Sequence, residues 1–176
     1  MTDKLFFDTD CISSFLWIND TSIIENLYSG LIVIPEPVYN ELSNPCVPHL
    51  KQQTDKLIDS GIAKLQEISV DSEEYKLYQQ LIQNKISSKS IGNGEAAGIA
   101  LARLENGVLA SNNYKDIAPY IEKYKLNHID TGTILIEALN NNIIDEKEGN
   151  NIWTNMLRRN RFLPEKTFSD YLRKNK

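Results

Sequence analysis

Four acidic residues spread along the chain could together form one oxygen-rich site: Asp8, Glu41, Glu95 and Asp116. Each follows a segment expected to be a strand or stands near the start of an expected helix. In a parallel sheet such positions meet at one edge, because the carboxyl ends of the strands lie together. Carboxylates are hard ligands that suit Mg²⁺ or Mn²⁺ better than zinc. The spacing therefore predicts a magnesium or manganese site.

Asp8 is the strongest of these candidates. It ends the apolar run of residues 4–7, and Asp10 follows two positions later in the turn. A helix cap accounts for one of these acids. Two acids at the end of a buried strand need a further explanation, because like charges repel unless a cation or a proton intervenes. We therefore expect Asp8 to be functional and leave Asp10 as either a supporting ligand or a cap.

The other acids are weaker signals when each is taken alone. Glu41 has the position of an ordinary surface glutamate. Glu95 stands in the first turn of an expected helix, where the helix dipole favours an acid. The glycines and alanines around Glu95 also permit a close approach of the backbone to a site. Asp116 lies five residues after Ser111, and Asn112 and Asn113 between them offer amide ligands or caps.

Short apolar strands alternate with helices along most of the chain. The expected strands are residues 4–7, 31–34, 63–68, 107–111 and 126–129. We expect Asn93 to cap the helix of residues 94–105. This order requires crossover connections, so the sheet should be mostly parallel with helices on both faces. The expected fold is a three-layer α/β/α arrangement.

Composition places the chain among ordinary globular proteins. It has 176 residues, of which 41% are hydrophobic and 24% charged, enough for one domain with a core. No apolar stretch approaches the roughly 20 residues of a membrane helix, and the acidic N-terminal segment does not resemble a signal peptide. We expect a cytoplasmic protein with no membrane partner, in which Cys11 and Cys46 are free thiols.

Charge and histidine content narrow the chemistry. The net charge is −5 and the pI about 5.1, which argues against nucleic-acid binding through overall positive charge. A carboxylate site that recruits cations is still compatible with a nuclease. Two histidines on unrelated segments make a histidine-based zinc site or a Ser-His-Asp triad a poor explanation. The arginines at 158, 159 and 161 form either a solvated helix end or a surface that faces RNA or a partner.

Four segments in this order resemble the PIN-domain family, including its VapC-type toxin nucleases: LFFDTDCISSFL, IPEPVYNEL, GNGEAAGIALA and VLASNNYKDI. The resemblance covers residues 4–130 and implies a metal-dependent endoribonuclease. The family's acidic positions correspond to Asp8, Glu41, Glu95 and Asp116, with Ser111 and Asn113 as supporting polar residues. It implies that Asp8, Glu95 and Asp116 hold the metal and that Glu41 orients a bound water.

The resemblance also implies an organisation and a set of partners. Residues 1–140 would form the PIN-like domain, and residues 141–176 a helical C-terminal extension packed on it. The partners would be an RNA substrate, a small antitoxin protein and a second copy of the chain in a homodimer.

Two positions depart from the family pattern. Asn113 stands where many members have aspartate, which would weaken a second metal site. Asp10 stands where asparagine or serine is common, and its carboxylate would partly compensate. The number of bound metal ions is therefore open.

Two other functions fit parts of the pattern. In a haloacid-dehalogenase-like phosphatase, Asp8 would be the nucleophile and Asp10 the general acid. The small residues that usually follow such a pair are missing, because Cys11 and Ile12 stand there. The second alternative is a non-catalytic PIN-like module that binds RNA or protein.

Overall fold

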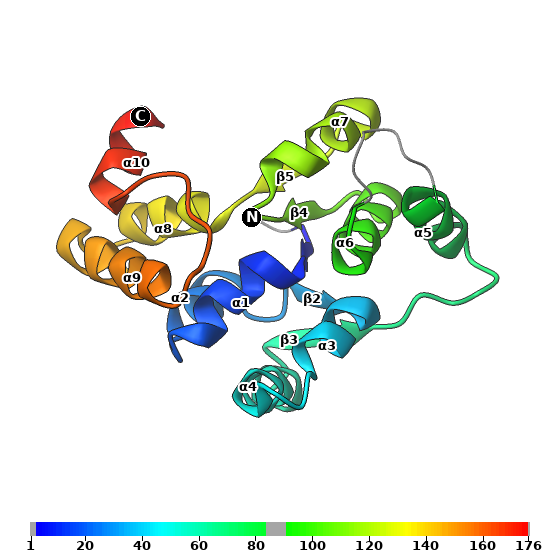
Figure 1. Ribbon diagram of the computed structural model, residues 1–176, viewed down its shortest axis with the longest axis horizontal. Helices are drawn as coiled ribbons and strands as arrows, with labels where there is room; N and C mark the ends of the chain where they lie inside the picture. The colour runs from blue at the N-terminus through cyan, green and yellow to red at the C-terminus, as the bar shows by residue number, and fades with distance from the viewer. Residues whose placement is uncertain (1–2, 84–90, 176) are drawn as a thin grey trace.

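A five-stranded sheet lies at the centre of the computed structural model, which describes residues 3–83 and 91–175 (Figure 1). The strand order is β3-β2-β1-β4-β5, and every neighbouring pair is parallel. The strands are β1 (Leu5–Phe7), β2 (Ile32–Pro35), β3 (Ala63–Gln66), β4 (Val108–Ala110) and β5 (Asn127–Ile129). The expected parallel sheet is confirmed, and β1 occupies its middle.

Helices cover both faces of this sheet. Successive side chains of each strand point to opposite sides, and the apolar side chains on each face are buried under helices. Phe6, Val33 and Leu109 belong to one apolar cluster, whereas Leu5 and Phe7 belong to the other. The first cluster is covered by α5 (Glu73–Gln83), α6 (Asn93–Leu104) and α7 (Tyr114–Tyr124). The second is covered by α1 (Thr9–Trp17), α2 (Ser22–Tyr28), α3 (Glu36–Leu42), α4 (Pro48–Asp59), α8 (Thr131–Asn140), α9 (Glu146–Arg158) and α10 (Phe168–Lys174). The three-layer prediction is confirmed.

Short polar side chains cap the starts of some of the helices. Asp8, Asp130 and Asp145 are the N-caps of α1, α8 and α9, and each accepts a hydrogen bond from a backbone amide three residues later. The expectation that Asn93 caps a helix is wrong. Gly92 occupies the N-cap and Asn93 is the first helical residue of α6; the Glu95 carboxylate accepts from the Gly92 amide instead.

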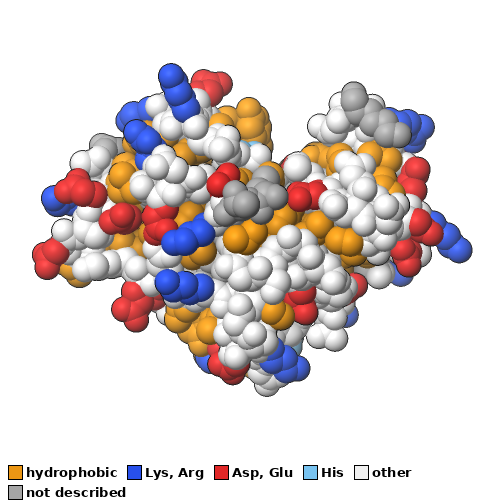
Figure 2. Space-filling model, turned by 180° about the vertical axis from the view of Figure 1, so that it is seen from behind, with side chains coloured by type: hydrophobic (Ala, Val, Ile, Leu, Met, Phe, Trp, Pro, Cys, Tyr) orange, Lys and Arg blue, Asp and Glu red, His pale blue; other side chains and the backbone are white. Residues whose placement is uncertain are grey.

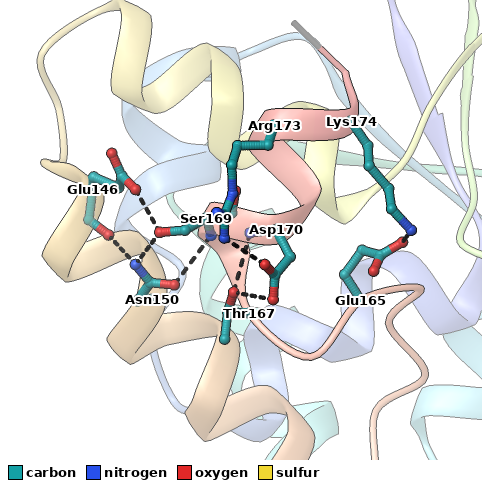
Figure 3. A network of polar contacts seen from close by, with 8 residues as sticks. All are labelled: Glu146, Asn150, Glu165, Thr167, Ser169, Asp170, Arg173 and Lys174. Atoms are coloured by element: carbon teal, nitrogen blue, oxygen red, sulfur yellow. Dashed lines mark hydrogen bonds and ion pairs between the residues drawn. The ribbon is translucent and has the colours of Figure 1, made fainter.

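The last two helices pack against the rest of the molecule. Trp153 and Phe168 are fully buried in the same cluster as Phe7. Gly149 permits this packing, because a Cβ there would lie 2.4 Å from Phe168 Cδ1. Figure 3 shows the polar network around α10: the Ser169 amide donates to Asn150 Oδ1 of α9 at 3.1 Å, and Asn150 Nδ2 donates to Ser169 Oγ at 2.7 Å.

The surface carries both signs of charge. Figure 2 shows acidic and basic side chains interspersed among apolar ones on the face opposite that of Figure 1. This mixture agrees with the modest net charge of −5. None of the helices in residues 3–83 and 91–175 combines the length and apolar character needed to cross a bilayer.

Candidate functional site

The carboxylate of Asp8 is buried at the carboxyl end of β1, the central strand. Its side chain is 1% exposed. Oδ1 accepts the Cys11 amide at 2.7 Å, which makes Asp8 the cap of α1. Asp10, for which a cap was one interpretation, instead lies in the first turn of that helix. Oδ2 is buried and has no hydrogen-bond partner. Such an oxygen is costly to bury when it is ionised and uncompensated, so it is available to a cation or a proton.

Burial raises the pKa of Asp8 from 3.8 to about 7, because the ionised form loses its water. The Ser111 hydroxyl, which lies near the carboxylate without making a hydrogen bond to it, and the Cys11 amide act against this shift by stabilising the ionised form. The charges of Asp10 and Glu95 add to it. Two of the acids that were expected to share the site, Asp10 and Glu95, therefore lie close enough to Asp8 to act on its charge.

Glu41 reaches this site from α3. Its Oε2 accepts the Thr9 hydroxyl, and its Oε1 accepts the backbone amide of Gly94 at 3.2 Å. These two contacts join the starts of α1 and α6 to α3. They hold the Glu41 carboxylate in a fixed orientation, although its side chain is exposed to solvent.

Gly94 permits that convergence. A Cβ at this position would lie 2.7 Å from Thr9 Oγ1 and 3.2 Å from Glu41 Oε2. The first distance is shorter than side-chain contacts allow. The small-residue start of α6 therefore has the role that its glycines indicated, a close approach of backbone to the acidic site.

Asn113 links the remaining two acids. Its Nδ2 donates to Glu95 Oε1 at 2.7 Å and to Asp116 Oδ2 at 2.8 Å. Its backbone amide donates to Ser111 Oγ at 3.3 Å. One neutral amide thus supplies both of its protons to two carboxylates, a contact that offsets part of their mutual repulsion.

An open cavity of about 220 Å³ lies where α1, α3 and α6 begin or pass. It is lined by Asp8, Thr9, Asp10, Glu41, Gly92, Gly94 and Glu95. Three of the four predicted acids and the supporting Asp10 therefore line one space. Asp116 does not line the cavity, and it joins the site through Asn113.

The donor set suits a magnesium-like ion. Among the residues that the structure describes, no three histidine, cysteine or acidic side chains are grouped to hold one ion together. Mg²⁺ is usually bound by one or two carboxylates and keeps several waters. The unpartnered Asp8 Oδ2 and the neighbouring Glu95 carboxylate provide such a pair, so the residues present fit this group. Asp116 as a metal ligand stays a prediction.

Sequence reasoning did not single out Thr9 as a site residue, and it gave Asn112 only as a candidate amide ligand or cap. Thr9 fixes Glu41, and its place between Asp8 and Asp10 was the only signal for it. Asn112 accepts the Thr131 amide at 2.9 Å and donates to Ser14 Oγ at 3.2 Å. It thereby ties the end of β4 to α1 and α8, and such a role depends on tertiary neighbours.

The arginine cluster divides into two parts. Arg161 lies with its guanidinium carbon 5.3 Å from the centre of the Trp17 ring, and it donates to Ser13 Oγ at 3.4 Å. Arg158 and Arg159 are exposed and line a separate open cavity of about 450 Å³. Arg161 thus packs on α1, the helix that Asp8 caps.

Comparison with known proteins gives the family. The family model DUF3368: PIN domain matches residues 4–176. No curated protein matches the chain. The match extends the expected resemblance, which ended near residue 130, through α8, α9 and α10. The carboxylates at the end of a central parallel strand and the family model agree, and the chain belongs to the PIN-domain family.

Proposed function

We propose that this protein is an Mg²⁺- or Mn²⁺-dependent endoribonuclease that hydrolyses RNA phosphodiester bonds. One observation carries the proposal: the buried Asp8 carboxylate has a free oxygen and lines a cavity together with Glu41 and Glu95. Burial of an uncompensated acid among other acids destabilises a fold. A site that binds a cation gives a reason for this arrangement.

Asp8 and Glu95 would hold the divalent ion, with Asp116 reaching it through water. When bound, the ion supplies a water of lowered pKa and offsets the charge that develops on phosphorus and on the leaving oxygen. Asn113 fixes the Glu95 carboxylate by donating to its Oε1. Ser111, behind Asp8, stabilises the ionised form of that acid.

Glu41 would orient the attacking water and take its proton. Each of its oxygens accepts one hydrogen bond, Oε2 from the Thr9 hydroxyl and Oε1 from the Gly94 amide. An ionised carboxylate has further lone pairs for a water. As the water oxygen bonds to phosphorus and the bond to the leaving oxygen breaks, Glu41 receives the released proton and solvent protonates the leaving oxygen.

The proposal includes the biological setting that the toxin resemblance implies. In it the protein is the toxin of a toxin–antitoxin pair, forms a homodimer, and is inhibited by a small antitoxin that binds over the acidic cavity. Membership of the PIN-domain family leaves the phosphatase interpretation without support. A non-catalytic PIN-like module is the competing interpretation that the experiment must separate.

The test is cleavage of labelled tRNA and single-stranded RNA in Mn²⁺, in Mg²⁺ and in EDTA. We expect cleavage that requires the metal and that disappears in Asp8→Asn, which removes a charge at almost constant volume. Circular dichroism of the variant verifies that it is folded. Full activity in a folded Asp8→Asn protein would contradict the proposal, and Mn²⁺ binding without cleavage of any RNA would favour the non-catalytic module.

A further inference from the structure

A second and larger cavity lies directly beside the acidic one. Its volume is about 480 Å³, within the range of roughly 300–1,000 Å³ that is usual for small-molecule sites. It is lined by Glu36, Pro37, Asn40, Glu41, Ile68, Tyr75, Tyr78 and Asn93. Glu41 lines both cavities, so the two spaces meet at the residue expected to orient the attacking water.

Two tyrosines form one side of this cavity. Tyr75 and Tyr78 are neighbours on α5, with ring centroids 6.2 Å apart and planes tilted by 45°. Both side chains are half-buried, so each ring is held by packing and still presents a surface. The helix α5 packs on α6, which carries Glu95, and α6 in turn packs on α3, which carries Glu41 (Figure 1). The position of the two rings on α5 therefore depends on the packing of α5 against α6.

The charge of the lining decides which part of a nucleotide fits. Glu36 and Glu41 are acidic and exposed, and burial together with Tyr75, Glu41 and Glu36 raises the pKa of Tyr78. These acids repel a phosphate. An uncharged planar ring gains from stacking on tyrosine and from contact with Ile68 and Pro37. The cavity therefore suits a nucleobase and not the sugar–phosphate backbone.

The polar groups of the lining add a preference among bases. An ionised carboxylate accepts hydrogen bonds and donates none, so it pairs well with an exocyclic amino group. Adenine, cytosine and guanine have such a group. Uracil has none, and the one donor on its Watson–Crick edge, N3–H, lies between two carbonyl oxygens that repel a carboxylate. Asn40 and Asn93 offer amides that both donate and accept. Glu36, which does not line the acidic cavity, is the residue that would read the amino group.

We propose that this cavity binds the base of an unpaired nucleotide next to the cleaved phosphate, and that it selects against uracil there. The inference rests on the proposed function, since it places the base beside the carboxylates that would cut the chain. Recognition of a single-stranded base by aromatic stacking and edge contacts is a common mode of RNA binding. The substrate would accordingly be single-stranded at the cleavage site.

The first experiment sequences the products of a randomised single-stranded RNA library after cleavage in Mn²⁺. We expect uracil to be depleted at one position beside the cut. Tyr78→Leu and Tyr75→Leu should each lower kcat/KM by roughly tenfold, in the range measured for a lost base stack. Glu36→Gln should weaken the selection against uracil without the roughly tenfold loss of kcat/KM expected for the tyrosine variants. Using two tyrosine variants guards against one that fails to fold.

The matched control is Tyr124→Leu. Tyr124 is half-buried like Tyr75 and Tyr78, but it lies beside Gly107 at the amino end of β4, the opposite end of the sheet. We expect it to retain the wild-type rate and base preference. If the wild type cleaves without base preference, or if both α5 variants cleave with wild-type rate and preference, the base-binding role is wrong while the nuclease proposal stands.

A binding assay separates the two proposals. In EDTA, the Asp8→Asn protein selects RNA from the same library on filters, so no cleavage is needed. Uracil depletion that is lost in the Asp8→Asn, Tyr78→Leu double variant supports the base site even if the wild type never cleaves RNA. Absence of any base preference in the bound pool overturns it.

Discussion

The side-chain amide of Asn113 donates to Glu95 Oε1 at 2.7 Å, and its second proton reaches Asp116 Oδ2 at 2.8 Å. A position where the family resemblance led us to expect an acid thus has a group that binds two acids together. The amide offsets part of the repulsion between carboxylates that a second cation would otherwise offset. Substitution of Asn113 should therefore change how strongly the stability of the protein depends on a bound metal ion.

Asn113→Asp should make the protein more dependent on metal. An ionised aspartate cannot donate, so two hydrogen bonds to charged groups are lost, each contributing about 1.5–3 kcal/mol at most. We expect a lower Tm than wild type in EDTA and a larger rise in Tm on addition of Mn²⁺, measured by differential scanning fluorimetry. Asn113→Ala is the control: it should lower Tm in EDTA without the added Mn²⁺ response. An equal Mn²⁺ response in Asn113→Asp and wild type would contradict this role.

The burial of Asp8 predicts how stability depends on pH when metal is removed. Its pKa rises from 3.8 to about 7 on folding, so the folded protein holds the proton longer than the unfolded chain. The stability contributed by the protonated acid is fully present below pH 4 and is lost as pH rises to about 7. The loss reaches about 4 kcal/mol at most, from 1.36 kcal/mol per pKa unit.

Asp8→Asn should remove that dependence, because the amide does not ionise. Urea denaturation in EDTA should therefore show the variant gaining on wild type between pH 4 and pH 7, with a constant difference at higher pH. Added Mn²⁺ should narrow this difference, since the ion binds the ionised acid. Parallel stability curves for the two proteins across this range would show that Asp8 titrates as an exposed carboxyl group does.

Gly94→Ala should damage the site more than the fold. The added Cβ would lie 2.7 Å from Thr9 Oγ1 and 3.2 Å from Glu41 Oε2, so either these side chains or α6 must shift, and the contacts that orient Glu41 are disturbed. Overpacking of this kind reduces stability by roughly 1–3 kcal/mol. We expect a loss of RNA cleavage that exceeds the loss of folded protein at the assay temperature.

Gly98→Ala on the same helix is the matched control for that experiment. Its Cβ would meet the end of the Leu109 side chain at 2.9 Å; neither residue lines the acidic cavity, and a flexible side chain can shift. Both variants should change the Tm, but only Gly94→Ala should change cleavage per folded molecule. Equal activity of the two folded proteins would mean that the close approach of α6 to Thr9 and Glu41 is not needed for catalysis.

Tyr171→Phe should loosen the attachment of α10 to α8. The Tyr171 hydroxyl donates to Asp130 at 2.8 Å, and Asp130 also caps α8 by accepting the Thr133 amide at 2.7 Å. Loss of a hydrogen bond to a charged, half-buried acid should reduce the free energy of unfolding by about 1.5–3 kcal/mol. Urea denaturation measures this change. A reduction below about 0.5 kcal/mol, the lower limit for an ordinary hydrogen bond, would mean that packing alone holds α10.

The amino-acid sequence by itself determined the three layers and the succession of strands and helices along the chain. Apolar runs such as residues 31–34, closed by Pro35, are readable because a strand buried on both faces needs only apolar side chains. The small residues around Gly94 are a local signal of the same kind. Patterns of this sort act within a few residues of the chain, which is why they predicted the sheet and the edge where the acids gather.

Tertiary structure alone decided how those acids are arranged. Glu41 lies 53 residues from Gly94 in the chain, and their contact depends on how α3 and α6 pack on the sheet. The free oxygen of Asp8 and the double donation by Asn113 likewise depend on neighbours that no local pattern specifies. Burial and hydrogen-bond geometry are properties of the packed core, so the sequence predicted which residues could meet, and packing determined which of them do.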